Sequence, residues 1–386
     1  MNRKRMWLFV IIVILCSIFT VRAEDGEENA ESLYAQWQET FLEELKLDDI
    51  QEILDGELGD HHFSIMETLK SLMKGEIPFS KEVVQKFLYN LFFLRINKER
   101  ELIMKVTLLI LFAAIFHVFT DVFGNGQVGN ISFYVVYLLL FIFLTDDFSE
   151  MSQELERKLT WFADFMKGLT PAYYMTVAAS NGISTATFFY QGVLFLVLII
   201  QWGLKSIVLP CANLYILLMF VNHLSKEEMV SKLADLLHSL TGWMLKTFTG
   251  IVVGMQVVQN MVIPVVDSLK RGLLGKTASV IPGVGNAVNT VTELMLTGAM
   301  LIRNSFGAVI LLVIILVGAE PMIHYLFMTL IYKVLSAVAE PVSDKRIVSC
   351  LTTMGEGCML LFRIFFHGEF LCMVTFLILA MSFGGR

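Results

Sequence analysis

The chain has 386 residues, of which 56% are hydrophobic and only 17% are charged, and its mean hydropathy is +0.67. Soluble domains contain about 25% charged residues, so the composition excludes a soluble globular enzyme and a disordered tail. The net charge of −7 leaves no broad positive field that would attract nucleic acid. The sequence therefore predicts an all-α, polytopic helical membrane protein.

An export signal is predicted over residues 1–23. Three basic residues precede an apolar run that is shorter than the ~20 residues needed to cross hydrocarbon. Val21 and Ala23 then provide small side chains at the −3 and −1 positions of a signal-peptidase site. We expect cleavage after Ala23, with an uncleaved anchor as the alternative. In both cases the next segment lies outside the cytoplasm.

That next segment, residues 24–100, is predicted to be a small extracytoplasmic helical region. It holds half of all the acidic residues of the chain. Its first residues, EDGEENAE, are too polar to pack, so they form a flexible lead. From Leu33 onward, apolar residues recur at helical spacing. We expect a helical cap that packs on the membrane core.

About eight hydrophobic spans follow, give or take one. They are Leu102–Phe123, Ile131–Thr145, Thr185–Gly203, Ser206–His223, Gly242–Val266, Ser305–Gly318, Pro321–Ala339 and Met359–Phe383. With an outside start, Lys205, the basic cluster at residues 270–276 and the Lys345–Arg346 pair all fall in the cytoplasm. This agrees with the positive-inside rule.

Two stretches that flank the membrane indicate an inverted repeat. SKEEMVSKL (Ser225–Leu233) and SDKRIVSCL (Ser343–Leu351) share Ser, Val, Ser and Leu in register. Three predicted spans separate them, and an odd number turns the second copy upside down. The expected organisation is a segment of two spans and an amphipathic stretch at 101–170, then membrane repeats at 171–266 and 267–386. Opposed repeats are typical of secondary transporters.

The first of these stretches also predicts an interfacial helix. Ser225 is placed to cap it and Glu228 to complete a capping box. An apolar stripe follows: Met229, Leu233, Leu236, Leu237, Leu240 and Met244. We expect Ser225, Glu228, Lys345 and Arg346 to be candidates for docking a partner. Plain packing at the membrane surface is the alternative.

Enzyme motifs are incomplete in this sequence. GLLGKT (Gly272–Thr277) has lysine at position 270, where a phosphate-binding loop needs glycine. GVGN has Asn286 where an intramembrane aspartyl protease needs a carboxylate. HExxH and GxSxG are absent. We therefore expect no enzymatic activity, catalytic residue, cofactor or bound metal.

Polar side chains within the spans are the remaining functional candidates. A charge at the bilayer centre costs about 3 kcal/mol, so such groups face protein or water. Those near the span ends can reach the membrane surface by snorkelling. The candidates for lining a conduit are Gln256, Gln259, Glu320 and Lys333. Structural pairing is the alternative interpretation.

Four stretches resemble the stage III sporulation protein AE family of endospore-forming Firmicutes. They are PAYYMTVAAS (Pro171–Ser180), VNHLSKEEMVSKL (Val221–Leu233), IPGVGNAVNTVTE (Ile281–Glu293) and EPVSDKRIVSCL (Glu340–Leu351). The likeness runs from about residue 100 to the end. The amino-terminal signal and acidic region agree with the family in type.

The resemblance implies a multi-pass protein of the mother-cell membrane around the forespore, within the channel-like complex between the two cells. The partners it implies are a secretion-type ATPase, ring-forming stage III A proteins and the forespore SpoIIQ complex, together with membrane lipid. It implies no nucleic acid and leaves a homo-oligomer open. The expected role is an export-gate or permease-like core required for spore development. A non-conducting scaffold for the ring and ATPase components is the alternative, and an intramembrane enzyme is disfavoured.

Overall fold

Helices account for nearly all of the computed structural model. It describes residues 32–58, 63–76, 99–112, 114–115, 126–181, 192, 195–224, 230–274 and 285–382. Its labelled helices are α2 (Asp48–Leu58), α3 (Ile65–Met73), α5 (Gly126–Asn181), α7 (Leu209–Leu224), α8 (Ser231–Leu274), α9 (Gly285–Ala339) and α10 (Lys345–Ser382). Helix also covers 32–44, 99–112 and 195–203. These described residues contain no strand, so the predicted all-α class is confirmed.

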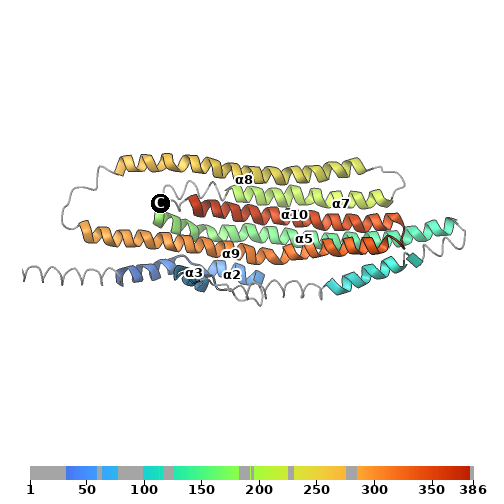
Figure 1. Ribbon diagram of the computed structural model, residues 1–386, viewed down its shortest axis with the longest axis horizontal. Helices are drawn as coiled ribbons and strands as arrows, with labels where there is room; N and C mark the ends of the chain where they lie inside the picture. Colours follow the sequence, from blue (N-terminus) through green and yellow to red (C-terminus); the bar gives the residue numbers. More distant parts are fainter. Residues whose placement is uncertain are drawn as a thin grey trace, which may run out of the picture.

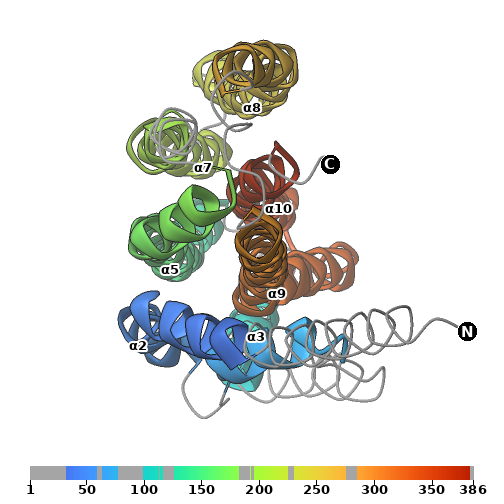
Figure 2. The ribbon, with the colours of Figure 1, turned by 90° about the vertical axis from the view of Figure 1, so that its left-hand side faces the viewer.

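A π-helical turn, η1 (Leu204–Val208), connects residues 195–203 to α7 without a break. Five long segments therefore lie side by side with alternating directions: α5, residues 195–224, α8, α9 and α10 (Figure 1). Seen along the bundle, α8 lies at one edge, next to α7, and the amino-terminal helices lie at the opposite edge (Figure 2). Between these edges, α10 packs against α9, α7 and α5.

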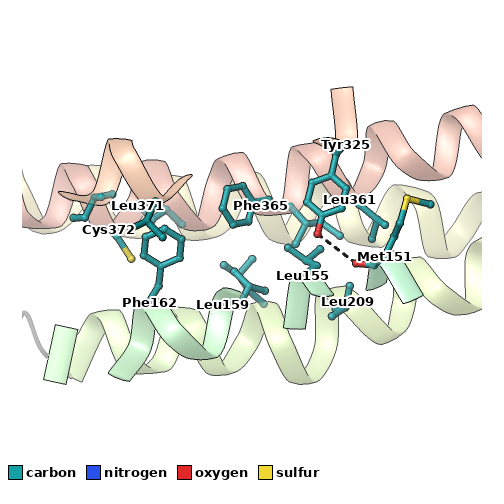
Figure 3. Close-up of a cluster of buried hydrophobic side chains, with 14 of the residues drawn as sticks. Met151, Leu155, Leu159, Phe162, Leu209, Tyr325, Leu361, Phe365, Leu371 and Cys372 are labelled. Carbon is teal, nitrogen blue, oxygen red and sulfur yellow. Dashed lines mark hydrogen bonds between the residues drawn. The ribbon is translucent and has the colours of Figure 1, made fainter. Parts of the chain in front are cut away.

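The core of the bundle comes from apolar faces that repeat at helical spacing. On α5, Met151, Leu155, Leu159 and Phe162 are buried and point toward α10 and α9 (Figure 3). The hydroxyl of Tyr325 on α9 donates a hydrogen bond to the Met151 carbonyl over 3.3 Å. Positions three and four apart share one helix face, which explains why these four α5 residues form one packing surface.

The predicted cap is helical in its described parts, but it does not sit on an end of the bundle. The helices of residues 32–76 lie along the side of α5 and α9 (Figure 1). The Trp161 indole on α5 donates a hydrogen bond to the Ile53 carbonyl on α2 over 3.1 Å. The predicted export signal lies outside the described residues.

The described helices contain fewer candidate membrane spans than the sequence predicted. Among the described residues, three segments are long and apolar enough to cross a membrane: Phe195–Leu224, Leu294–Ala339 and Lys345–Leu377. The prediction of about eight spans is therefore not supported. Its third and fourth spans form one helix through Lys205, and its sixth and seventh form one helix through Pro321.

Two charged residues, Lys205 and Glu320, explain why the sequence predicted separate spans where the structure has continuous helices. Lys205 Nζ lies 3.2 Å from Glu156 Oε1, and Glu320 Oε2 lies 3.6 Å from Lys158 Nζ. Lysine and glutamate are both good helix formers, so neither ends the helix. The opposite charge from α5 offsets the cost of each charge within an apolar segment. Lys205 is therefore in a helix and not in a loop. The 55 residues of α9 extend about 83 Å, far beyond the ~30 Å hydrocarbon core.

The described helices do not support the predicted inversion of two repeats either. Two helices, α8 and α9, rather than three spans separate the stretches near Leu224 and Lys345. His223 Nε2 lies 2.8 Å from Thr353 Oγ1, so α7 ends where α10 begins, at the right-hand end of Figure 1. Lys270 and Arg271, near the end of α8, therefore lie at the other end of the bundle from the Lys345–Arg346 pair.

Cysteine labelling tests this arrangement. In a chain without its native cysteines, Lys232→Cys and Val342→Cys are expected to react with a membrane-impermeant maleimide from the same side. Both exposed positions are close to the shared end of α7, α8, α9 and α10. Leu274→Cys, at the far end of α8, should react from the other side. Labelling of positions 232 and 342 from opposite sides would restore the inverted repeat.

Only part of the apolar stripe of the predicted interfacial helix faces outward, because Leu237 and Met244 pack against the core. Leu233, Leu236 and Leu240 on α8 are exposed, whereas Ala234 and Thr241 are fully buried against the bundle. Small side chains allow helices to approach closely, so they form the packing face. The longer leucines are left for lipid or for another protein.

Candidate functional site in the middle of the bundle

A charged layer crosses the middle of the bundle, and we define it as Glu57, Glu156, Lys158, Lys205 and Glu320. Lys158 on α5 is its centre, with only 14% of its side chain exposed. Its ammonium group forms an ion pair with Glu57 of α2, and Glu320 Oε2 of α9 lies 3.6 Å away. One cation therefore joins three elements that are far apart in the chain.

The second cation of the charged layer lies on the π-helical turn. Lys205 Nζ is 3.2 Å from Glu156 Oε1 and donates a hydrogen bond to Thr160 Oγ1 over 3.1 Å. Glu156 and Thr160 lie one turn apart on α5, so both can face the same amine. A π-turn inside a longer helix often marks a functional position. Here it places Lys205 against α5 within an otherwise apolar segment.

An acidic cavity of about 410 Å³ lies next to the charged layer, between the helix of residues 99–112, α5 and α9. Its described lining residues are Glu99, Glu101, Leu102, Lys105, Phe143, Asp146, Asp147, Glu150, Met151, Glu154, His324 and Met328. The two ring nitrogens of His324 lie 3.6 Å from Glu99 and 3.4 Å from Glu154. The cavity therefore offers mainly carboxylates, which suits a cationic or polar occupant.

Asp147 is the most perturbed carboxyl group of this cavity. Its pKa is raised from the ordinary 3.8 to about 6, chiefly by burial, and the negative charges of Glu99 and Glu150 contribute to this rise. A hydrogen bond of 2.6 Å from the Tyr332 hydroxyl opposes this rise. Asp147 lies on α5, outside the three candidate spans.

This shift predicts a pH dependence of stability. The folded state holds the Asp147 proton more tightly than the unfolded chain, so this stabilisation is complete below the ordinary pKa of 3.8 and is lost as the pH rises to about 6. Within that window the loss amounts to at most about 1.4 kcal/mol per pH unit. Thermal unfolding of the purified protein should show a weaker slope for Asp147→Asn. The exposed control Asp164→Asn should keep the wild-type slope, and an unchanged slope in Asp147→Asn would contradict the assignment.

The structure does not gather the predicted conduit-lining residues into one place. Glu320 is part of the charged layer, whereas Lys333 is exposed and lies 13 residues, or about 20 Å, farther along α9. The side chains of Gln256 and Gln259 fall outside what the structure describes.

Of the four predicted docking residues, the structure describes only two. Ser225 and Glu228 lie outside the described residues. Lys345 is exposed at the start of α10, and Arg346 beside it is half-buried. The Arg346 amide donates a hydrogen bond of 2.9 Å to Asp344 Oδ1, so Asp344 caps this helix.

Sequence reasoning missed the residues of α5 that organise the site. Its signal is a run of charged residues four apart, Asp146, Glu150, Glu154 and Lys158, which places them along one helix face. In the described part of the chain, no group of three His, Cys, Asp or Glu residues is placed to hold a metal ion. The arrangement offers ion pairing and a polar cavity inside an apolar bundle.

Comparison with known proteins gives a consistent result. The family model described as Stage III sporulation protein AE matches residues 63–382. The protein named Stage III sporulation protein AE of Bacillus subtilis (strain 168) is 25% identical over 345 residues, which cover 88% of this chain and 86% of that protein. No solved structure matches.

Proposed function

Because the chain belongs to the stage III sporulation protein AE family, we propose that it is the export-gate or permease-like membrane core of the stage III sporulation complex. A role in sporulation and a membrane location follow from the family and from the three apolar segments. The observation that supports a permease-like role is the charged layer, which lies beside a cavity inside a bundle of apolar helices.

The physical argument starts from the energy of a charge in hydrocarbon. Ionisable groups in membrane segments are expensive and typically face a protein interior or a water-filled path. Lys205 and Glu320 lie in two different candidate spans, and both turn toward α5. A polar pathway along α5, beginning at the acidic cavity, is the role that we assign to them. Gln256, Gln259 and Lys333 stay proposed lining residues.

The remaining assignments complete this proposal. We place the protein in the mother-cell membrane around the forespore, with its amino-terminal region outside the cytoplasm. The ATPase and the ring-forming stage III A proteins, with the forespore SpoIIQ complex beyond them, are the proposed partners. Lys345, Arg346 and the outward leucine stripe of α8 offer contact surfaces.

A scaffold without a pathway is the second candidate function, and one observation favours it. The charges of the layer pair with one another: Lys158 with Glu57 and Glu320, and Lys205 with Glu156. Ion pairs between helices, whether largely buried like Lys158–Glu57 or partly exposed like Lys205–Glu156, can serve packing alone. In that case the bundle anchors the complex, and its exposed surfaces recruit the other components.

Substitution of the lining residues separates the two functions. The experiment uses a sporulating strain in which this gene carries four substitutions together: Gln256→Leu, Gln259→Leu, Glu320→Gln and Lys333→Met. A permease-like core should lose traffic between forespore and mother cell while the protein is still made and still recruits its partners. A scaffold should keep both traffic and spore yield.

The matched control is the exposed ion pair of α5, Lys167 and Asp164. Lys167→Met and Asp164→Asn change the same kinds of charge at the surface, and they should leave traffic unchanged. Normal traffic in the four-residue variant, with normal spores, would exclude the permease-like proposal.

A further inference from the structure

One carboxyl group inside the bundle lacks the cation that the charged layer provides to its neighbours. Glu369 on α10 is only 4% exposed, and its Oε2 atom has no hydrogen-bond partner. In the described part of the chain, Glu369 forms no ion pair. Glu57, Glu156 and Glu320, by contrast, each have a lysine within ion-pair distance.

Helix α9 closes over this carboxyl group at Gly318. A Cβ atom built on Gly318 would lie 2.2 Å from the carboxyl carbon of Glu369 and 2.3 Å from each carboxyl oxygen. Side-chain atoms do not approach this closely, so glycine makes room for the acid between α9 and α10. The fit also blocks water from that side while the two helices remain in contact.

The other polar groups near Glu369 are neutral. One turn along α10, Cys372 Sγ accepts a hydrogen bond of 3.0 Å from Gln201 Nε2. Gln201 is 4% exposed, and its Oε1 atom has no hydrogen-bond partner among the described residues. The pocket around Glu369 is therefore polar at its edge but carries no positive charge.

The charged groups on the surrounding elements are engaged elsewhere or lie at the surface. On α5, Lys158 pairs within the charged layer, and Lys167 pairs with Asp164 at the surface. Lys205 of η1 contacts Glu156, and Glu320 of α9 contacts Lys158. Exposed cations outside these pairs include Arg157 of α5, Lys246 of α8, Lys333 of α9 and Arg363 of α10. Arg303 of α9 is buried, but it lies 15 residues, or about 22 Å, from Gly318 along the helix and donates hydrogen bonds to Asn304 Oδ1. His367 of α10 contacts the Arg363 carbonyl through Nδ1.

A buried carboxylate ion without a partner is so costly that the group takes up a proton instead. We propose that Glu369 is a proton-binding site inside the bundle, which releases its proton only when α9 and α10 separate at Gly318. On release, the carboxyl O–H bond breaks and the proton passes to water that enters between the helices. Proton exchange is then coupled to helix movement. The coupling to export rests on the permease-like function proposed above, whereas the proton site does not.

Carbodiimide labelling tests the proton site in the full-length protein in lipid vesicles. A protonated carboxyl group gives its proton to a nitrogen of dicyclohexylcarbodiimide, and its oxygen adds to the central carbon. Acyl transfer then yields a stable N-acylurea with no leaving group. Mass spectrometry should find this adduct on Glu369. Its yield should fall about tenfold per pH unit once the group ionises.

Matched variants identify the group. Glu369→Gln should lose the adduct, whereas Glu320→Gln should keep it at the wild-type level. A water-soluble carbodiimide should leave Glu369 unmodified. Gly318→Ala displaces the acid and should change the labelling rate several-fold, while Gly242→Ala, with nothing within 4 Å of its new Cβ, should not.

Two labelling results on the wild-type protein alone would contradict the proposed proton site. One is an unlabelled Glu369 in wild-type protein whose other carboxyl groups react. The other is equal labelling of Glu369 by both reagents. The coupling has its own test, because Glu369→Gln should slow forespore traffic. Normal traffic in that strain, together with a labelled wild-type Glu369, would reject the coupling and keep the site.

Discussion

Replacement of Lys158 by methionine is expected to destabilise the protein and release its amino-terminal helices from α5. Methionine keeps most of the apolar stem, but it leaves Glu57 and Glu320 without their shared cation. Removal of one partner from a largely buried pair costs about 3 kcal/mol. Thermal unfolding of the purified protein should show this loss. Limited proteolysis should cut the segment around α2 at least several times faster.

The control for this variant is Lys167→Met, farther along the same helix, α5. Its ion pair with Asp164 is exposed, with 53% and 55% of the two side chains accessible. Exposed pairs contribute less than about 1 kcal/mol, so this variant should behave like wild type. Lys158→Met combined with Glu57→Gln should recover part of the lost stability, because an unpaired carboxylate is then removed. Equal behaviour of the two methionine variants would show that Lys158 does not hold these elements together.

Gly357→Leu is expected to prevent α10 from packing against α5 and α7. A Cβ atom at position 357 would lie 2.8 Å from Ile216 Cδ1 and 2.9 Å from Phe148 Cε2. Both neighbours are buried, with exposed fractions of 1% and 4%, so neither has free space to enter. Overpacking of this kind costs about 3 kcal/mol. The folded fraction on size-exclusion chromatography should fall sharply, with a smaller fall for Gly357→Ala.

Gly250→Leu is the matched control, because it makes the same exchange within a long helix. Gly250 is exposed on α8, and a Cβ there meets nothing within 4 Å. Leucine has the better helix propensity, so this variant should be neutral or more stable by up to about 1 kcal/mol. A well-folded Gly357→Leu protein would mean that α10 does not approach α5 and α7 as closely as the structure indicates.

The sequence predicted the helical class well but the helix ends poorly. Apolar composition and 3.6-residue periodicity were sufficient to predict helices, but the last span was predicted to begin at Met359, whereas α10 begins at Lys345. The charges at Lys205 and Glu320 were read as helix ends, because a single sequence does not show which distant residue neutralises them. Their partners, Glu156 and Lys158, lie 49 and 162 residues away in the chain.

The lack of information on distant partners also explains which residues of the candidate site the sequence predicted and which it missed. Glu320 was found from its position in an apolar stretch, and it does belong to the charged layer. Glu57 was not found, because nothing in an acidic segment distinguishes the one carboxylate that faces a lysine of another helix. The direction of the apolar stripe on α8 was left open by the sequence for a related reason. Periodicity locates an apolar face, but only the packing of neighbours shows whether that face is turned inward.

The length of α5 gives the bundle a mechanical property. Its 56 residues form a rod of about 84 Å, and Lys158 holds that rod near its midpoint. A pivot there converts rotation into opposite displacements at the two tips. A tilt of roughly 5° would move each tip by about 4 Å, enough to open or close a passage one side chain wide. Leverage of this kind would transmit a movement from one end of the bundle to the other.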